Sequence, residues 1–244
     1  MEIPKPPWPK LGRRIESAIR KAIYDYKMLE GVKDLAIALS GGKDSLTLLF
    51  MLNAINGRGF APFRLHAILI DGEFSCGSGV NKDYLSSLCS QMGVNFITRN
   101  STQTLDTLEC YRCSRERRSL IFEAALKVGA TTIAFGHHRD DNAETVMMNL
   151  LNKGEFAGNL PLINMHQYGV TLIRPMIYIS EHEIIEFAKA EKFIRAFCKC
   201  PVGLTSMRKK VDELLNDIEL LYPNARENIA RAGLMYGSKK AGFK

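Results

Sequence analysis

Apolar and polar positions along this chain follow two periods, and the changes from one period to the other predict its secondary structure. Residues 11–30 repeat apolar side chains every three or four positions, which predicts an amphipathic helix that ends near Gly31. Short apolar runs typical of buried strands follow at 35–39, 65–70, 94–97 and 131–135. Helical patterns fill the intervals at about 45–56, 80–92 and 114–128. This alternation predicts an α/β fold with a mostly parallel sheet and helices on both faces.

The pattern becomes wholly helical after Arg174-Pro175-Met176. Ser180 and Glu183 have the spacing of a capping box before the next apolar stretch, and two last helices are predicted at about 206–221 and 224–235. We therefore expect three segments: an N-terminal arm and helix (1–30), an α/β domain (31–180) and a C-terminal helical extension (181–244).

The most informative segment joins the first predicted strand to the next helix. It reads Ser40-Gly41-Gly42-Lys43-Asp44-Ser45. Two glycines allow a sharp turn that brings backbone N–H groups close to a ligand, and the helix N-terminus and Lys43 add positive charge. The segment predicts a polyphosphate site, although its spacing is not that of Walker A. The alternative is an ordinary strand-to-helix turn with Asp44 or Ser45 in the first helical turn.

Two more polar loops follow predicted strands, namely Asp71-Gly72-Glu73 and Gly136-His137-His138-Arg139-Asp140-Asp141. The carboxyl ends of parallel strands meet at one edge of a sheet, so the three loops are expected to share a crevice. Asp140 and Asp141 are candidate ligands of Mg²⁺ there, because this ion takes oxygen ligands. The alternative is an acidic helix N-terminus. His137 and His138 fit an acid, a base or a hydrogen-bond donor, and the sequence does not choose among these roles.

The six cysteines include two close pairs, Cys110-Tyr111-Arg112-Cys113 and Cys198-Lys199-Cys200. The first pair has the spacing found in zinc ribbons and iron–sulfur proteins, and the second pair offers a third or fourth thiolate. A site with three protein ligands leaves one metal position open, which is a catalytic arrangement. The alternative is unligated core cysteines, which is what we expect of Cys76 and Cys89.

Lys and Arg outnumber Asp and Glu by 33 to 26, and the formal charge of +7 favours a polyanionic partner. Basic clusters at 13–21, 112–118, 208–210 and 239–244 suit RNA phosphates, with solvated helix faces as the alternative. The first ten residues contain four prolines and no apolar stretch. We therefore predict neither a signal peptide nor a membrane span, and we expect a cytoplasmic protein. Trp8 belongs either to a disordered lead or to an arm that packs on the domain.

SGGKDS resembles the PP-loop of the N-type ATP pyrophosphatases, which cleave ATP to AMP and pyrophosphate to adenylate a substrate oxygen. With Cys-x-x-Cys-Ser-Arg-x-Arg-Arg and GHHRDD following in that order, the chain resembles the tRNA 2-thiocytidine synthetase family, the TtcA type, over most of residues 10–222. The resemblance implies the adenine nucleotide alpha-hydrolase fold, ATP with Mg²⁺, and a [4Fe–4S] cluster held by three cysteines. It also implies that sulfur replaces the C2 oxygen of a tRNA pyrimidine, with cytidine as the expected base.

The same resemblance assigns roles to single positions. It implies that Cys110, Cys113 and Cys200 hold the cluster, with Cys198 as the alternative third ligand. The implied nucleotide-binding residues are Ala38, Ser40, Gly41, Gly42, Lys43, Asp44, Ser45, Asp71, Arg117, Gly136, His137 and Asp141. The implied catalytic residues are Lys43, Asp44, Asp140 and the three cysteines.

The implied partners are tRNA, a cysteine desulfurase or other sulfide donor, and a second copy of the chain in a homodimer. Three alternatives remain open. The chain fits a tRNA 2-thiouridine synthetase, a PP-loop ligase that forms amides without cluster chemistry, or a zinc-stabilised RNA-binding protein without enzymatic activity.

Overall fold

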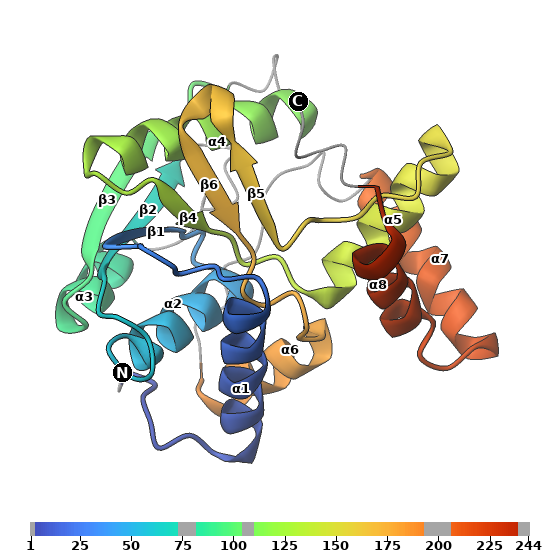
Figure 1. Ribbon diagram of the computed structural model, residues 1–244, viewed down its shortest axis with the longest axis horizontal. Helices are drawn as coiled ribbons and strands as arrows, with labels where there is room; N and C mark the ends of the chain where they lie inside the picture. Colours follow the sequence, from blue (N-terminus) through green and yellow to red (C-terminus); the bar gives the residue numbers. More distant parts are fainter. Residues whose placement is uncertain (1–2, 73–81, 104–109, 193–205, 239–244) are drawn as a thin grey trace.

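The computed structural model describes residues 3–72, 82–103, 110–192 and 206–238, which form a six-stranded sheet covered by helices (Figure 1). The strands are β1 Asp34–Ala38, β2 Arg64–Asp71, β3 Asn95–Asn100, β4 Thr132–Ala134, β5 Leu162–Met165 and β6 Val170–Ile173. The helices are α1 Lys10–Asp25, α2 Lys43–Ile55, α3 Lys82–Gln91, α4 Cys110–Lys127, α5 Arg139–Lys153, α6 Glu181–Ala190, α7 Met207–Leu221 and α8 Ala225–Tyr236.

The strand order is β3-β2-β1-β4-β6-β5, and every neighbouring pair is parallel except β5 and β6. The predicted α/β fold with a mostly parallel sheet is therefore confirmed. The hydrophobic pattern did not predict β5 or β6, because each has four residues and one turn, His166–Tyr168, joins them. This hairpin adds an antiparallel edge to the sheet.

Alternate residues of the central strands face two different cores. Leu35 and Ile37 of β1 lie in the core beneath α1, α2 and α6, whereas Ala36 lies in the core beneath α4. This period of two places helices on both faces, as predicted. It also leaves the carboxyl ends of β1 and β4 uncovered at the edge where the polar loops begin.

Helices α5, α7 and α8 make a third, smaller core beyond the sheet, and Figure 1 shows them gathered at one side of the molecule. Ala143, Val211, Leu215 and Ala230 are its buried residues. The predicted C-terminal extension is thus divided in the structure. Its first helix, α6, packs in the core under the sheet, whereas α7 and α8 enclose α5.

The N-terminal arm packs on the domain. The Trp8 side chain is buried. Its ring packs edge-on against the Phe187 ring, with the ring centroids 5.7 Å apart, and its Nε1 donates a hydrogen bond to Glu16 Oε2 at 2.6 Å. Of the two alternatives for Trp8, the packing arm is therefore correct. In the described ranges, no helix is both long enough and apolar enough to cross a membrane.

Candidate functional site

The loop between β1 and α2 is held in a tight turn by its own side chains. Gly41 has a φ of +76°, a conformation that side chains disfavour. The Ser40 N–H donates to Ser45 Oγ at 3.1 Å, and Ser45 Oγ donates to the Gly42 carbonyl at 3.1 Å. These bonds fix the loop where helix α2 begins at Lys43. The loop has the backbone of an anion site, with the N-terminus of a long helix behind it.

The loop after β4 lies directly against this turn. A Cβ atom built at Gly136 would lie 3.2 Å from the carbonyl carbon of Asp44, so a side chain there would push the two loops apart. β4 pairs with β1 in the sheet, which brings the two loops to the same edge. The prediction of a shared crevice at the ends of these two strands is confirmed.

The crevice contains a cavity of about 220 Å³, which we call the first cavity. Four of its side chains form an apolar wall, namely Ile68, Ile70, Ile121 and Phe135. Its other residues are Ala38, Leu39, Ser40, Asp44, Ser45, Arg117, Gly136, His137 and Asp141. All of these except Leu39 are predicted nucleotide-binding residues. The cavity joins an apolar slot, suited to a flat ring, to a polar end at the loop.

A second cavity of about 290 Å³ adjoins the first, because Asp44 and Asp141 line both. It is strongly charged, and it is lined by Lys43, Asp44, His138, Asp141, Glu144, Glu181, Ser206, Arg208, Lys209 and Asp212. The predicted loop residue Lys43 belongs here rather than to the first cavity. Helix α7 supplies one wall, a contribution that the sequence did not predict.

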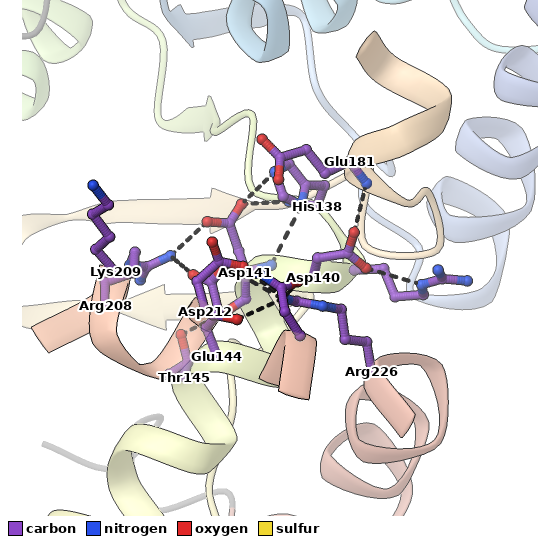
Figure 2. Close-up of polar contacts among 12 residues, drawn as sticks. His138, Asp140, Asp141, Glu144, Thr145, Glu181, Arg208, Lys209, Asp212 and Arg226 are labelled. Carbon is purple, nitrogen blue, oxygen red and sulfur yellow. Dashed lines mark hydrogen bonds and ion pairs between the residues drawn. The ribbon is translucent and has the colours of Figure 1, made fainter. Parts of the chain in front are cut away.

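Figure 2 shows Arg208 of α7 reaching across this cavity to two carboxylates of α5. Its Nη1 lies 2.5 Å from Asp141 Oδ1 and 3.2 Å from Glu144 Oε2. Burial would raise the pKa of Asp141, but nearby groups, His138 first and Arg208 among them, hold that pKa below its ordinary value. Asp141 is therefore an anion at neutral pH, paired with a cation from a distant segment.

Glu144 has the opposite character. Burial, partly offset by Arg208 and reinforced by the charges of Asp141 and Asp212, raises its pKa to about 7. Arg226 of α8 is its second cation, at 4.0 Å. Glu144 therefore changes its protonation within the physiological pH range.

Lys43 lies between two acids at the other wall of the second cavity. Its Nζ is 3.0 Å from Asp44 Oδ1 and 2.9 Å from Glu181 Oε1. Burial alone would lower the pKa of Lys43, but these two carboxylates raise it above the ordinary value. Lys43 therefore stays charged beside the loop.

His137 faces the first cavity as a neutral ring. Burial and then the positive charge of Arg174 lower the pKa of His137 well below its ordinary value. The Nε of Arg174 donates a hydrogen bond to His137 Nδ1 at 3.2 Å, so Nδ1 carries a lone pair. In a neutral imidazole the proton must then be on Nε2, which makes this atom a hydrogen-bond donor.

Two of the predicted carboxylates line neither cavity. Asp140 Oδ2 accepts a hydrogen bond from the backbone N–H of Glu181 at 2.7 Å (Figure 2). The other carboxylate oxygen of Asp140 accepts a hydrogen bond from Arg139 Nε at 3.2 Å. Asp140 thus holds the N-terminus of α6 and lines neither cavity, and its expected role in holding Mg²⁺ stays a prediction. The Asp71 carboxylate is paired with Lys82, and it also lies outside the lining of both cavities.

Among the cysteines, Cys113 is half-buried in the first turns of α4, and Cys110 is the first residue of that helix. Cys113 lies one helical turn before Arg117, which lines the first cavity. Cys76, Cys198 and Cys200 fall outside the described residues. Cys89 is fully buried in the main core, and burial raises its pKa to about 12, so its prediction as a core residue is confirmed.

Sequence reasoning missed several polar residues of the site, among them Glu144, Arg174 and Glu181. Glu144 was within reach, because it follows Asp141 by three positions and so lies on the same face of a helix. Arg208 had been placed in a basic cluster suited to RNA. No local signal indicates that its partner is Asp141, because 67 positions separate the two residues.

Comparison with known proteins gives a consistent result. Residues 11–195 match the PP-loop domain family. A tRNA-cytidine(32) 2-sulfurtransferase of Xylella fastidiosa is 35% identical over 91% of this chain and 77% of its own length. The enzyme of the same name from Geobacter sulfurreducens is 30% identical over 90% of this chain and 88% of its own length.

Among solved structures, the U34-tRNA thiolase NcsA from Methanococcus maripaludis, determined with its [4Fe-4S] cluster, has a TM-score of 0.76 and 24% identity. The match covers 91% of this chain and 78% of that one. The described fold is therefore the fold of a PP-loop thiolase.

Proposed function

This chain belongs to the PP-loop family and, within it, to the tRNA-cytidine(32) 2-sulfurtransferases, and from that membership we propose that it uses ATP to replace the C2 oxygen of a tRNA cytidine with sulfur. The target position is the one in the relatives' name, cytidine 32. One observation carries the proposal. The cavity formed by the glycine loop also contains Arg117, which lies on the helix that bears the Cys110 and Cys113 pair.

The first step is adenylation of the base. The C2 oxygen attacks the α-phosphorus of ATP, and the bond from that phosphorus to the pyrophosphate oxygen breaks. Negative charge builds up on the departing pyrophosphate. The N-terminus of α2 and the ammonium of Lys43 stabilise this charge, because both are fixed at the loop before the reaction begins.

ATP would occupy both cavities, with its adenine in the first and its terminal phosphates in the second. The apolar wall with Ile68 and Phe135 accepts adenine, and the charged second cavity accepts the β- and γ-phosphates. Arg208 and Lys209 face that second cavity from α7. We propose that Arg208 turns from Asp141 and Glu144 to the phosphates when ATP enters, since a guanidinium pairs equally well with phosphate oxygens.

The released carboxylates are suited to Mg²⁺. Asp141 is an anion, and Glu144 loses its proton readily near neutral pH. Hard oxygen ligands of this kind fit the ion, which supplies charge neutralisation between the phosphates. We propose Asp141, rather than Asp140, as the carboxylate of the GHHRDD loop that holds it.

His137 has a separate task. Its Nε2–H is available as a donor, since Nδ1 accepts from Arg174. We propose that this donor orients the base or the adenylate in the first cavity. A neutral ring suits this role, because it keeps its proton as the pH changes around 7.

In the second step sulfide attacks C2, the bond from C2 to the oxygen of the adenylate breaks, and AMP leaves. We propose that Cys110, Cys113 and Cys200 hold a [4Fe–4S] cluster, with Cys198 as the alternative third ligand. Cys113 fits this role, because its thiol lies one turn before a residue of the first cavity, Arg117. A cluster held by three thiolates supplies a carrier for sulfur beside the activated base.

The proposal extends to partners. A cysteine desulfurase or another sulfide source renews the sulfur, the chain works as a homodimer, and the reaction takes place in the cytoplasm where tRNA is modified. The alternative function is that of an amide-forming ligase of the same superfamily. A ligase reaction would give no role to the cysteine pair beside the nucleotide cavity.

The decisive experiment compares the wild-type protein with Cys113→Ala, both purified without oxygen. We expect about four irons per wild-type chain, and thiolated tRNA in the presence of ATP and sulfide. The variant should lose iron and thiolation but bind ATP with unchanged affinity. Zinc alone in the wild-type protein would contradict the cluster. Thiolation by the variant would contradict the role of Cys113.

The substrate base is tested with a transcript in which cytidine 32 is replaced by uridine. We expect thiolation of the cytidine transcript and none of the uridine transcript. Equal thiolation of both would favour a 2-thiouridine synthetase instead.

A further inference from the structure

A groove lies between helix α4 and the β5–β6 hairpin. Its volume is about 490 Å³. It is lined by Arg115, Glu116, Arg118, Ser119, Phe122, Met165, Gln167 and Tyr168. We call it the hairpin groove. None of these residues belongs to either cavity of the nucleotide site.

The hairpin groove combines an aromatic ring with two guanidinium groups. Tyr168 is 40% exposed, and its ring packs on the buried Phe122 with centroids 5.4 Å apart, which fixes the ring in place. Arg115 and Arg118 are both exposed. Unpaired RNA is recognised by groups of this kind, because bases stack on aromatic rings and phosphates pair with cations.

The acidic residue of the groove, Glu116, is hydrogen-bonded to the segment after β3. Glu116 accepts hydrogen bonds from the backbone and side chain of Thr102 at 2.7 and 2.8 Å, and from Ser101 at 3.1 Å. The Glu116 carboxylate is thus held by the segment after β3. With Arg115 and Arg118 against this one acid, the lining residues carry a small formal positive charge, which is complementary to a phosphate backbone.

The groove and the nucleotide site share α4 as a common wall. Arg117 and Ile121 line the first cavity, and the next residues, Arg118 and Phe122, line the groove. The charge of Arg118 also contributes to the lowered pKa of His137, so its guanidinium lies near the first cavity. A strand held in the groove is therefore next to the place where the target base must react.

We infer that the hairpin groove binds the tRNA strand on one side of the target cytidine, with Tyr168 stacking an unpaired neighbouring base and Arg115 and Arg118 contacting the flanking phosphates. This inference rests on the proposed function and deepens it, because it locates the RNA surface. The hairpin, which the hydrophobic pattern did not predict, then serves substrate recognition.

The test measures the affinity of the full chain for a labelled tRNA anticodon stem-loop by fluorescence anisotropy. Tyr168→Ala should weaken binding about 5- to 150-fold, as expected for one lost stacking contact of about 1–3 kcal/mol. Tyr168→Phe should bind like wild type, since it keeps the ring. Tyr236→Ala removes an exposed tyrosine of α8 and serves as the matched control.

The arginines are tested through salt dependence. The double variant Arg115→Ala, Arg118→Ala should lower the slope of log affinity against log salt by about 1–2, because two phosphate contacts are lost. Arg231→Ala, an exposed arginine of α8, is the control for a lost charge. Unchanged ATP affinity in every variant checks that the nucleotide site is intact.

A stem-loop with an abasic site next to the target cytidine identifies the stacked base. One of the two abasic neighbours should weaken wild-type binding as much as Tyr168→Ala does, and the two losses should not add. Wild-type affinity in both Tyr168→Ala and the arginine pair would overturn the inference while leaving the proposed function intact. Absence of tRNA binding and thiolation in the wild-type protein would overturn both.

Discussion

At the scale of single residues, two acids one turn apart on α5 have opposite ionisation behaviour. Asp141 is held as an anion by His138 and Arg208 against the effect of burial. For Glu144 the burial dominates, and its pKa rises to about 7. The pair thus offers one permanent negative charge and one adjustable charge, in line with the proposed role of Asp141 and Glu144 in holding Mg²⁺.

The raised pKa of Glu144 makes stability depend on pH. Between its ordinary pKa and about 7 the folded state keeps the proton and the unfolded state releases it, so stability falls as the pH rises through this range. Wild type should lose about 1–3 kcal/mol of unfolding free energy between pH 5 and pH 8 through Glu144, and Glu144→Gln should not show this loss. Urea unfolding at four pH values measures the unfolding free energy of both proteins. Parallel curves for variant and wild type would contradict the raised pKa, and the exposed Glu213→Gln is the control.

Arg208 is the second residue whose role can be isolated. Arg208→Ala should weaken Mg²⁺–ATP and pyrophosphate binding at least about tenfold, because a charged hydrogen bond contributes about 1.5–3 kcal/mol. Lys210→Ala removes an exposed cation from the same turn of α7, outside the second cavity, and should leave both affinities unchanged. Calorimetric titration measures both ligands. Equal affinity in Arg208→Ala would restrict this residue to a structural ion pair.

At the scale of elements, the ends of helices position the site. Helix α5 begins with a capping box between His138 and Asp141, so one carboxylate serves both the helix and the cavity. Helix α6 begins with the predicted capping box of Ser180 and Glu183. The neighbouring N–H of Glu181 is bound by Asp140, which ties α6 to α5 and places the Glu181 side chain against Lys43.

The α6 cap gives a stability prediction. Ser180→Ala should destabilise the protein by about 1 kcal/mol, because Ser180 Oγ accepts a hydrogen bond from the Glu183 N–H at 3.3 Å. Ser180→Gly should destabilise the protein by only a few tenths of a kcal/mol, since glycine is itself a tolerated N-cap. Denaturant unfolding compares the three proteins. A loss much larger than about 2 kcal/mol would mean that the contact between α5 and α6 fails as well.

At the scale of the whole molecule, the charged cavity is built from two bodies. The sheet and α2 supply the glycine loop, and the helical group α5, α7 and α8 supplies Asp141, Glu144 and Arg208. Arg226 of α8 holds this group together, with hydrogen bonds to Asp212, Asn216 and Glu219 of α7. Because α7 carries Arg208 and is bonded to α8, the packing of α8 on α5 determines the position of Arg208.

The contact between α8 and α5 is close enough to test directly. A Cβ atom at Gly233 would lie 2.5 Å from Val146 Cγ2. Gly233→Val should therefore destabilise the protein by about 1–3 kcal/mol through overpacking, and it should weaken ATP binding by displacing α7. Val146→Ala in the same chain should restore part of both losses, since it returns the volume. No recovery would contradict packing as the cause.

Much of this protein follows from sequence, because the signals are local. The strand period, the glycine pair before Lys43 and the Ser180 cap each depend on neighbouring residues, and each was found within its own segment. The order of strand and loop also predicted the common crevice, since parallel strands end at one edge. The fold class and the first cavity were thus determined by the sequence itself.

What the tertiary structure decided involves partners far apart in the chain. The polar partners of Asp140 and Asp141 differ because α6 lies against the first carboxylate and α7 against the second, and both helices are distant in sequence. The β5–β6 hairpin is too short for a periodic signal, and it becomes a strand pair because β4 provides an edge. Arg208 looks like one more surface cation until α7 packs against α5. Its environment, and therefore its charge partners, exist only in the folded chain, since Coulomb attraction and burial depend on distances in space rather than along the sequence.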